Sequence, residues 1–381
     1  MSSKSGVPYL DFYKKHKISP VEQDISDLQK HFERRTALYR SLGLLPGYFK
    51  DKAILEFGPG SGHNALFTKS LAPRKYVLVD GNPVGLERTT ALLKKYPLET
   101  DNYEVVESFI HDFRSNELFD VVICECTLAS QHAPVDFLKH LAGFVKKGGI
   151  LLVSAGDSVG WLGEILRNFI GLLMIDPKDN IDKKLGILRP IFKPHLDSLK
   201  NMSRPIDDWI LDNVIQPLLG NLISIPEAIT ALDGEFEIYG SSPKFLTDWR
   251  WYKDIAGSGK KYNEMAIDLA NQNTHNFLDY RFTYPPQPIE VNHKIRSLCE
   301  AIFMLFKKST VDFNREHLRS LIHNLKELAL TVKKYSPQTA ASFEDYAKAV
   351  DYYLIHKSFP EFKEFVPFWG RATQYLSFTR G

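Results

Sequence analysis

The stretch with the clearest capacity for chemistry runs from Glu56 to Gly62, where an acidic residue precedes three glycines at alternate positions. The letters are Glu-Phe-Gly-Pro-Gly-Ser-Gly, and they follow a short apolar run over residues 53–55. This pattern predicts a strand, a tight turn and a helix N-terminus, the usual start of an α/β nucleotide-binding sheet. Glycines suit such a turn because it requires positive φ angles, and because a backbone without Cβ atoms lets a ligand approach closely.

Two classes of ligand are compatible with this turn. A dinucleotide places its pyrophosphate on the helix N-terminus, and Gly60, Gly62 and Ala65 fit the G-x-G-x-x-A form of that fingerprint. This alignment leaves Glu56 without a role. The other alignment starts at the acidic residue and reads Glu56-x-Gly58-x-Gly60-x-Gly62.

A second acidic residue, Asp80, ends the predicted strand over residues 76–79 and is followed by Gly81 and Asn82. An acidic side chain about 20 positions after the glycine turn is placed to accept hydrogen bonds from both ribose hydroxyls. Dehydrogenases share this feature. Asp80 therefore indicates an adenosyl ligand without distinguishing the two classes.

Three further strands are predicted in order along the chain. Val105-Val106 precedes the segment that holds His111 and Asp112, Phe-Asp-Val-Val opens a strand over 119–125, and Gly-Gly precedes a strand over 148–154. With the glycine turn, this order resembles the class I S-adenosylmethionine-dependent methyltransferases over residues 50–155. The resemblance implies an α/β fold with a seven-stranded Rossmann-like sheet, strand order 3-2-1-4-5-7-6. It also implies S-adenosyl-L-methionine as cofactor and S-adenosyl-L-homocysteine as product.

The resemblance also implies roles for individual residues. In the family, the first acidic residue holds the methionine end of the cofactor and the glycines pass beneath its carboxylate and ribose. An acidic residue after the third strand meets the adenine amino group. The expected cofactor-binding residues are Glu56, Gly58, Pro59, Gly60, Gly62, Asp80, Gly81, Asn82, His111, Asp112 and Glu125.

The loop over residues 127–132 directly follows the fourth predicted strand. In an open α/β sheet the ligand crevice lies beyond the carboxyl ends of the strands, so we expect this loop to face the transferred methyl group. His132 is our candidate general base, because an ordinary histidine pKa near 6.5 suits proton removal at neutral pH. Glu125 is the second catalytic candidate. Alternatively, His132 is a loop histidine that only hydrogen-bonds a neighbouring backbone group.

Helical patterns surround the predicted sheet. Apolar residues recur at helical spacing between 21 and 43, and Ser19-Pro20 suggests the start of that helix. An apolar segment, 161–174, opens the region between the fifth and sixth strands, and apolar stripes fill much of 298–354. The predicted organisation is an N-terminal helical cap (1–50), a cofactor-binding core (51–155), a helical lid with the acceptor region (156–233), the last two strands (234–243 and 372–379) and a helical insertion (244–371).

Composition narrows the class of protein. The 381 residues are 44% apolar and 25% charged with a net charge of +2, which is typical of a globular protein and gives no strong field for nucleic acid. Three cysteines make no disulfide framework, and without a second ligand pair we expect no metal site. No apolar run is long enough to span a membrane, and the first residues lack the apolar core of a signal peptide, so we expect a cytoplasmic protein.

The expected function is methyl transfer by an SN2 reaction from S-adenosyl-L-methionine to a small-molecule, glycan or lipid-precursor acceptor. No Asn/Asp-Pro-Pro-Tyr follows the fourth strand and no Pro-Cys occurs, so the resemblance does not extend to the amino-group or cytosine-C5 methyltransferases. Two alternatives stay open: an NAD(P)-dependent oxidoreductase, and a catalytically silent cofactor-binding scaffold. Neither the acceptor atom nor the oligomeric state follows from the sequence.

Overall fold

The computed structural model describes residues 8–97, 102–216, 220–255 and 261–381. The chain folds as two compact units. Unit 1 comprises residues 1–156, 216–270 and 373–381, and unit 2 comprises residues 157–215 and 271–372. Residues 156–233, the expected helical lid and acceptor region, contribute to both units.

Unit 1 contains a seven-stranded sheet with the order β3-β2-β1-β4-β5-β7-β6, which confirms the predicted topology. Five strands are parallel, whereas β7 pairs antiparallel with both β5 and β6. The last strand comes from the chain end, as predicted, and the intervening residues are mainly helical. The strands are β1 (Ala53–Phe57), β2 (Lys75–Asp80), β3 (Tyr103–Glu107), β4 (Phe119–Cys124), β5 (Val145–Ala155), β6 (Phe236–Ser242) and β7 (Gln374–Arg380).

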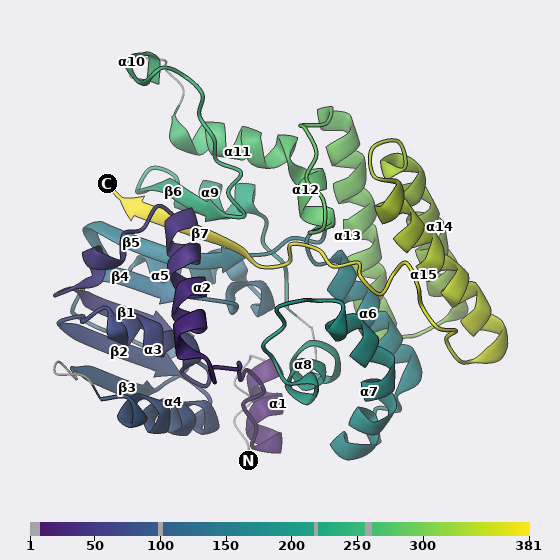
Figure 1. Cartoon of the computed structure of the whole chain (residues 1–381), viewed down its shortest axis with the longest axis horizontal. Helices are drawn as coiled ribbons and strands as arrows, with labels where there is room; N and C mark the ends of the chain where they lie inside the picture. Colours follow the sequence, from purple (N-terminus) through teal and green to yellow (C-terminus); the bar gives the residue numbers. More distant parts are fainter. Residues whose placement is uncertain (1–7, 98–101, 217–219, 256–260) are drawn as a thin grey trace. The chain divides into compact units, whose positions relative to one another are not determined.

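Helices cover both faces of this sheet (Figure 1). One face of β1, which carries Ile54 and Glu56, packs beneath α2 and α3, whereas Phe57 on the other face contacts Phe113 and Phe144. The strands are apolar on both faces because both are covered, as expected for parallel sheets. The unit 1 helices are α1 (Pro8–His16), α2 (Leu28–Ser41), α3 (His63–Ser70), α4 (Pro83–Lys95), α5 (Pro134–Ala142), α9 (Ile225–Leu232) and α10 (Tyr252–Ile255), and α11 (Tyr262–Gln272) ends at the unit boundary.

The helix that we expected to begin at Ser19-Pro20 does not begin there, so that prediction was wrong. The helix α2 begins at Leu28, and the Asp27 side chain caps it by accepting a 2.9 Å hydrogen bond from the Lys30 backbone N–H. The buried Ser19 instead lies 3.4 Å, oxygen to oxygen, from Ser61 of the glycine turn. This part of the chain is not helical and lies against the glycine turn.

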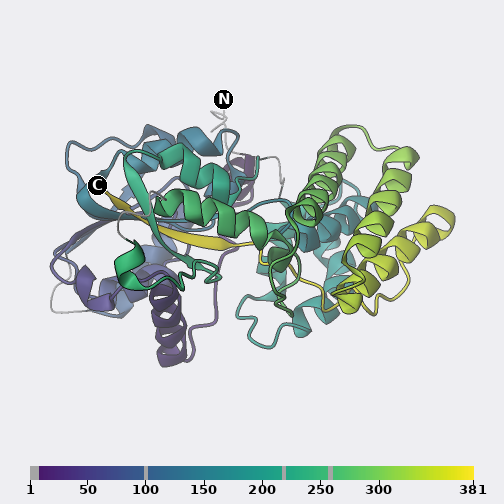
Figure 2. The same cartoon turned by 90° about the horizontal axis from the view of Figure 1, so that it is seen from above.

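Unit 2 is helical, and α13, α14 and α15 lie side by side in it (Figure 2). The guanidinium of Arg167, which is fully buried, stacks 3.5 Å from the Trp369 ring centre and donates to the carbonyls of Gly163 and Phe368. These contacts tie α6 to the segment that leaves the unit. Its helices are α6 (Leu162–Met174), α7 (Ile181–Asp197), α8 (Ile206–Ile210), α12 (Thr274–Leu278), α13 (Ile289–Val311), α14 (Arg315–Val332) and α15 (Pro337–His356).

Searches for other kinds of site were limited to the described ranges. None of the helices there is long and apolar enough to cross a membrane. Within the same ranges, no group of three or more His, Cys, Asp or Glu side chains is arranged to hold a metal ion. Cys124, Cys126 and Cys299 are free thiols.

Candidate functional site

The glycine turn has the backbone that the sequence predicted. Gly58, Gly60 and Gly62 have φ angles of 70°, 60° and 82°, a region that side chains disfavour. The Gly58 N–H donates to the Val79 carbonyl at 2.8 Å, which fixes the turn against β2. Gly62 lies just before α3, so the free N–H groups of the first helical turn face the same end of the sheet.

Asp80, at the end of β2, is joined directly to this turn. One carboxylate oxygen accepts a 3.3 Å hydrogen bond from the Gly60 N–H, and the other accepts a 2.8 Å bond from the Asn82 N–H. Loss of water around the carboxylate raises the pKa of Asp80 to about 6, although these N–H groups act in the opposite direction. The side chain is half-buried, so it can still accept a hydrogen bond from a ligand hydroxyl.

Glu56 is buried beneath α2 and α3, with 6% of its surface exposed. The Tyr76 hydroxyl donates a hydrogen bond to its carboxylate. Burial raises the pKa of Glu56 to about 7, and the nearby Glu125 carboxylate raises it further, whereas the Tyr76 hydrogen bond lowers it. A cationic group placed beside Glu56 would therefore favour its ionised form.

Glu125, which follows β4, makes a bidentate ion pair with Arg35 of α2. The two guanidinium nitrogens lie 2.9 and 2.6 Å from the two carboxylate oxygens, and the Asn64 amide adds a third hydrogen bond at 3.1 Å. The Arg35 and Glu125 side chains are only 7% and 10% exposed. Burial lowers the pKa of Arg35, but the Glu125 carboxylate more than offsets this and holds that pKa above its usual range.

The candidate base His132 is exposed in the loop that follows β4. Its backbone carbonyl accepts a 2.6 Å hydrogen bond from the Asn221 amide, which anchors the loop within unit 1. Its imidazole makes no hydrogen bond to any residue in the described ranges. The ring is thus free to exchange a proton with a substrate.

The two adenine candidates, His111 and Asp112, both lie in the short helix η2 (Ile110–Asp112) after β3. The Ser108 N–H donates to the Asp80 carbonyl at 3.1 Å, so this segment begins beside the end of β2. His111 and Asp112 are both exposed; His111 contacts the Gln131 amide, whereas the Asp112 carboxylate makes no hydrogen bond or ion pair to another described residue. The structure therefore brings Asp80 and the start of the η2 segment together.

The N-terminal segment lies over the loops of this site. A Cβ atom on Gly60 would lie 2.7 Å from Val21, and one on Gly81 would lie 2.7 Å from Leu10 of α1. The Asn82 amide donates to the Ile18 carbonyl at 3.0 Å. Both Gly81 and Asn82, which we expected to bind a cofactor, thus also hold the N-terminal segment.

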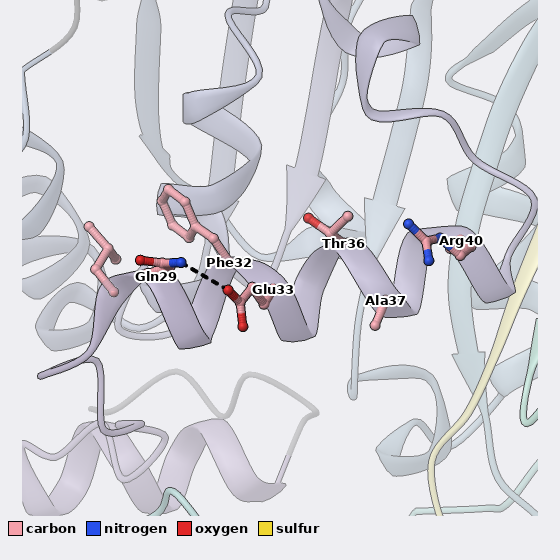
Figure 3. A pocket seen from close by; sticks show the side chains of 7 residues that line it. Gln29, Phe32, Glu33, Thr36, Ala37 and Arg40 are labelled. Atoms are coloured by element: carbon pink, nitrogen blue, oxygen red, sulfur yellow. Dashed lines mark hydrogen bonds between the residues drawn. The ribbon is translucent and has the colours of Figure 1, made fainter.

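The outer face of α2 carries a separate hollow (Figure 3). Gln29 and Glu33 are joined there by a 3.0 Å hydrogen bond. None of the predicted site residues lines it; its lining is Leu28, Gln29, Phe32, Glu33, Thr36, Ala37 and Arg40. The candidate site therefore lies against the opposite, inward face of α2.

Sequence reasoning missed Arg35 and Asn64, which organise Glu125. A signal was present, because His31, Arg35 and Tyr39 are spaced four apart and all three are buried. A polar or charged side chain repeated at this spacing on the inward face of a helix indicates a partner inside the protein. The apolar residues of the same segment, such as Phe32 and Leu38, concealed that signal.

Residues 49–183 match a family model described as a methyltransferase domain. The match begins before β1 and continues past α6, so it includes the glycine turn, Asp80 and the loop after β4. No curated protein matches the chain.

Solved structures that resemble the chain do so distantly. The N-methyltransferase NodS from Bradyrhizobium japonicum, in complex with S-adenosyl-L-homocysteine, is 16% identical over 41% of this chain and 75% of its own, with a TM-score of 0.29. Magnesium protoporphyrin IX methyltransferase from Synechocystis PCC 6803, with bound S-adenosyl-L-homocysteine, is 13% identical over 44% and 78%, with a TM-score of 0.35. A methyltransferase from Clostridium acetobutylicum is 15% identical over 42% and 60%, with a TM-score of 0.30.

Across the eight structures compared, the chain covers between 45% and 78% of the other protein's length. At these identities and TM-scores, the solved structures add nothing to the identification of a methyltransferase domain. That identification rests on the family model for residues 49–183 and on the order of the strands.

Proposed function

We propose that residues 49–183, which match a methyltransferase-domain model, form a class I methyltransferase domain, and that the protein is an S-adenosyl-L-methionine-dependent methyltransferase that acts on a small-molecule, glycan or lipid-precursor acceptor. The observation that carries this proposal is the contact between the glycine turn and Asp80. Three glycines with positive φ shape the turn, and the Gly60–Asp80 hydrogen bond sets a carboxylate beside it.

The cofactor supplies the methyl group and the sulfonium leaving group. The protein therefore has to bind the cofactor and the acceptor, orient them toward each other, and exclude water. Asp80 would accept hydrogen bonds from the ribose hydroxyls. Glu56, with Gly58, Pro59, Gly60 and Gly62, would surround the methionine end and its ammonium group. Gly81, Asn82, His111 and Asp112 would line the adenosine end.

We assign different roles to the two catalytic candidates. Both oxygens of Glu125 are already hydrogen-bonded, to Arg35 and Asn64, which supports a role in shaping the methionine end rather than in proton transfer. His132 has a free imidazole in the loop that follows β4, which supports its role as the general base. Proton removal matters when the acceptor is a hydroxyl or an ammonium group.

The acceptor class rests on weaker support. The chain has a net charge of only +2, which does not favour a nucleic acid, and it carries a second, helical unit. A modest-sized acceptor fits both features. We further propose that the protein acts in the cytoplasm.

The oxidoreductase alternative is disfavoured by topology. A dinucleotide-binding sheet is built from two parallel halves in the order 3-2-1-4-5-6. Here β7 inserts antiparallel between β5 and β6. The buried Glu56 beside the turn would also have no part in binding a pyrophosphate.

Calorimetric titration of the full chain with S-adenosyl-L-homocysteine, NAD and NADP tests the proposal. We expect saturable binding of S-adenosyl-L-homocysteine, at roughly micromolar Kd, and none of the dinucleotides. Binding of a dinucleotide alone would refute the proposal. A chain that binds S-adenosyl-L-homocysteine but forms none from S-adenosyl-L-methionine with any acceptor screened would favour the silent scaffold.

A further inference from the structure

Unit 2 contains a small cavity that is bordered by α12, by the segment after it and by the turn between α14 and α15. Its volume, measured for the centre of a water molecule, is about 10 Å³, which is room for one such molecule. Most of its lining is polar, and the polar side chains are His275, Asp279, Tyr284, Tyr335, Ser336 and Thr339. A cavity with this lining suits a small ligand that forms hydrogen bonds.

Four of these side chains bond to one another in a chain. The Tyr284 hydroxyl donates to Ser336 Oγ at 2.9 Å, and Thr339 Oγ1 donates to an Asp279 carboxylate oxygen at 2.7 Å. Ser336 Oγ and Thr339 Oγ1 lie 2.6 Å apart, and Ser336 must be the donor there because the Thr339 proton is already engaged. Every hydroxyl proton of this chain therefore has an acceptor, and none is left for another partner.

His275 presents a lone pair that these hydroxyls do not satisfy. It is 4% exposed, and its Nε2 atom makes no hydrogen bond to the described residues. The Asn292 amide donates to the carbonyls of Asn271 and Gln272, both at 2.9 Å, so its oxygen must face His275. That oxygen lies 3.0 Å from Nδ1, which is therefore the protonated nitrogen. Burial lowers the pKa of His275, so the ring is neutral at pH 7 and Nε2 is an acceptor.

The Tyr335 hydroxyl is the second group on this cavity without a bond. It is buried and makes no hydrogen bond to the described residues, and burial raises its pKa, so it keeps its proton. The Tyr335 and His275 rings meet edge to face, with their centres 5.8 Å apart and their planes at 81°. A donor and an acceptor thus border one cavity without a direct hydrogen bond between them.

We propose that one water molecule binds in this cavity, accepts a hydrogen bond from the Tyr335 hydroxyl and donates one to His275 Nε2. Water suits the site because it accepts and donates at once. The backbone carbonyls of Tyr284 and Pro285 act on the same imidazole, and either is a suitable acceptor for the second hydrogen of the water. The water would tie α12 to the turn between α14 and α15. This inference does not rest on the proposed function.

A high-resolution crystal structure of the full chain tests the site directly. We expect density for one water molecule within about 3 Å of both His275 Nε2 and the Tyr335 oxygen. A structure without density there, or one in which the two atoms bond directly to each other, would overturn the inference.

The sign of the effect of Tyr335→Phe tests the bridge in solution. A hydroxyl that is bonded to water loses that bond on substitution, whereas removal of a buried hydroxyl that has no partner is stabilising. We therefore expect Tyr335→Phe to lower the urea midpoint of unit 2. Tryptophan fluorescence follows this unit through Trp209 and Trp369, which are buried in it. A raised midpoint would contradict the bridge.

A double-mutant cycle then measures the coupling between the two groups. His275→Phe keeps a ring but removes Nε2, so Tyr335→Phe should cost less once His275→Phe is present. We expect the combined change in the unfolding equilibrium constant to fall short of the product of the single changes by about threefold or more. Simple additivity of the two substitutions would count against a shared water.

The matched control is Tyr353→Phe, which removes a hydroxyl that donates to the Leu173 carbonyl at 3.0 Å elsewhere in unit 2. Combined with His275→Phe, it should give additive effects. If His275→Phe does not fold, the crystal structure of Tyr335→Phe takes the place of the cycle. The water should then be lost or only partly occupied, and a fully occupied water at an unchanged position would refute the role of Tyr335.

Discussion

Arg35 and Glu125 form a bidentate ion pair that links the inward face of α2 to the end of β4. The nitrogen–oxygen distances are 2.9 and 2.6 Å, and both side chains are almost fully buried. The pair lies beside Glu56, whose pKa responds to both charges. The α2 helix is thus part of the site's electrostatics as well as of the protein core.

Removing one partner of this pair should destabilise unit 1. Arg35→Met leaves the Glu125 carboxylate buried without a counter-charge, and we expect the free energy of unfolding to fall by about 3–5 kcal/mol. The double variant Arg35→Met/Glu125→Gln should recover part of this loss, because no charge then stays unpaired. Urea unfolding followed by circular dichroism measures both.

The control for this prediction is Lys183→Met, which breaks the exposed Lys183–Asp179 pair and should leave the free energy of unfolding almost unchanged. Equal effects of Arg35→Met and Lys183→Met would contradict the importance that we give to the buried pair.

The raised pKa of Glu56 predicts that cofactor binding depends on pH. With a pKa of about 7 in the free protein, Glu56 is mostly protonated at pH 6. An ammonium group beside it favours the ionised form, so binding of S-adenosyl-L-homocysteine should release a proton there. Affinity should therefore rise with pH and level off above about 7.

Calorimetry at pH 6 in buffers of different ionisation enthalpy measures the number of protons released. Glu56→Gln, which cannot ionise, should lower the affinity and release fewer protons. Asp80, whose pKa is about 6, stays in place in both proteins, so the difference between them isolates Glu56. An unchanged proton count in Glu56→Gln would show that Glu56 does not face the ammonium group.

Much of the fold was predictable because its determinants are local. Apolar strands, the glycines between β1 and α3, and the acidic residue at the end of β2 each follow from a few adjacent residues. The start of α2 was not predictable, because Ser19-Pro20 is as good a local signal for a helix start as Asp27. In the structure Asp27 caps the helix, whereas Ser19 contacts Ser61, 42 positions away.

The residues of the candidate site also fall into those that local sequence indicates and those that only long-range contacts define. The sequence led us to propose Glu56, Asp80 and His132 from their positions relative to strands. It did not identify Arg35 or Asn64, because each is defined by a partner on a distant element. Glu125 was found, but only the structure shows that its two oxygens are occupied.

A side chain on Gly60 should disturb the site more than its backbone strain alone predicts. Gly60→Ala places a methyl group 2.7 Å from Val21, at a φ of 60°. Gly148 also has a positive φ, of 74°, but nothing lies within 4 Å of its missing Cβ atom. Gly148→Ala should therefore cost only the conformational strain, about 1 kcal/mol or slightly more.

We expect Gly60→Ala to weaken S-adenosyl-L-homocysteine binding at least tenfold in calorimetry and Gly148→Ala to leave it unchanged. Gly60→Val should abolish binding. Equal affinities in Gly60→Ala and Gly148→Ala would show that displacing Val21 from the turn does not disturb cofactor binding.

Substitution of His132 should separate cofactor binding from catalysis. Its imidazole is exposed and free of hydrogen bonds to the described residues, and only its backbone is anchored, by Asn221. His132→Ala should therefore leave folding and S-adenosyl-L-homocysteine affinity intact. If His132 removes the acceptor proton, kcat should fall by about 10²–10⁴-fold.

The assay is S-adenosyl-L-homocysteine formation with an acceptor found by screening hydroxylated and amine compounds. His323→Ala, an exposed histidine on α14, is the control and should keep full turnover. Full turnover in His132→Ala would leave alignment of the acceptor as the main source of catalysis, because an acceptor that is already deprotonated needs no base.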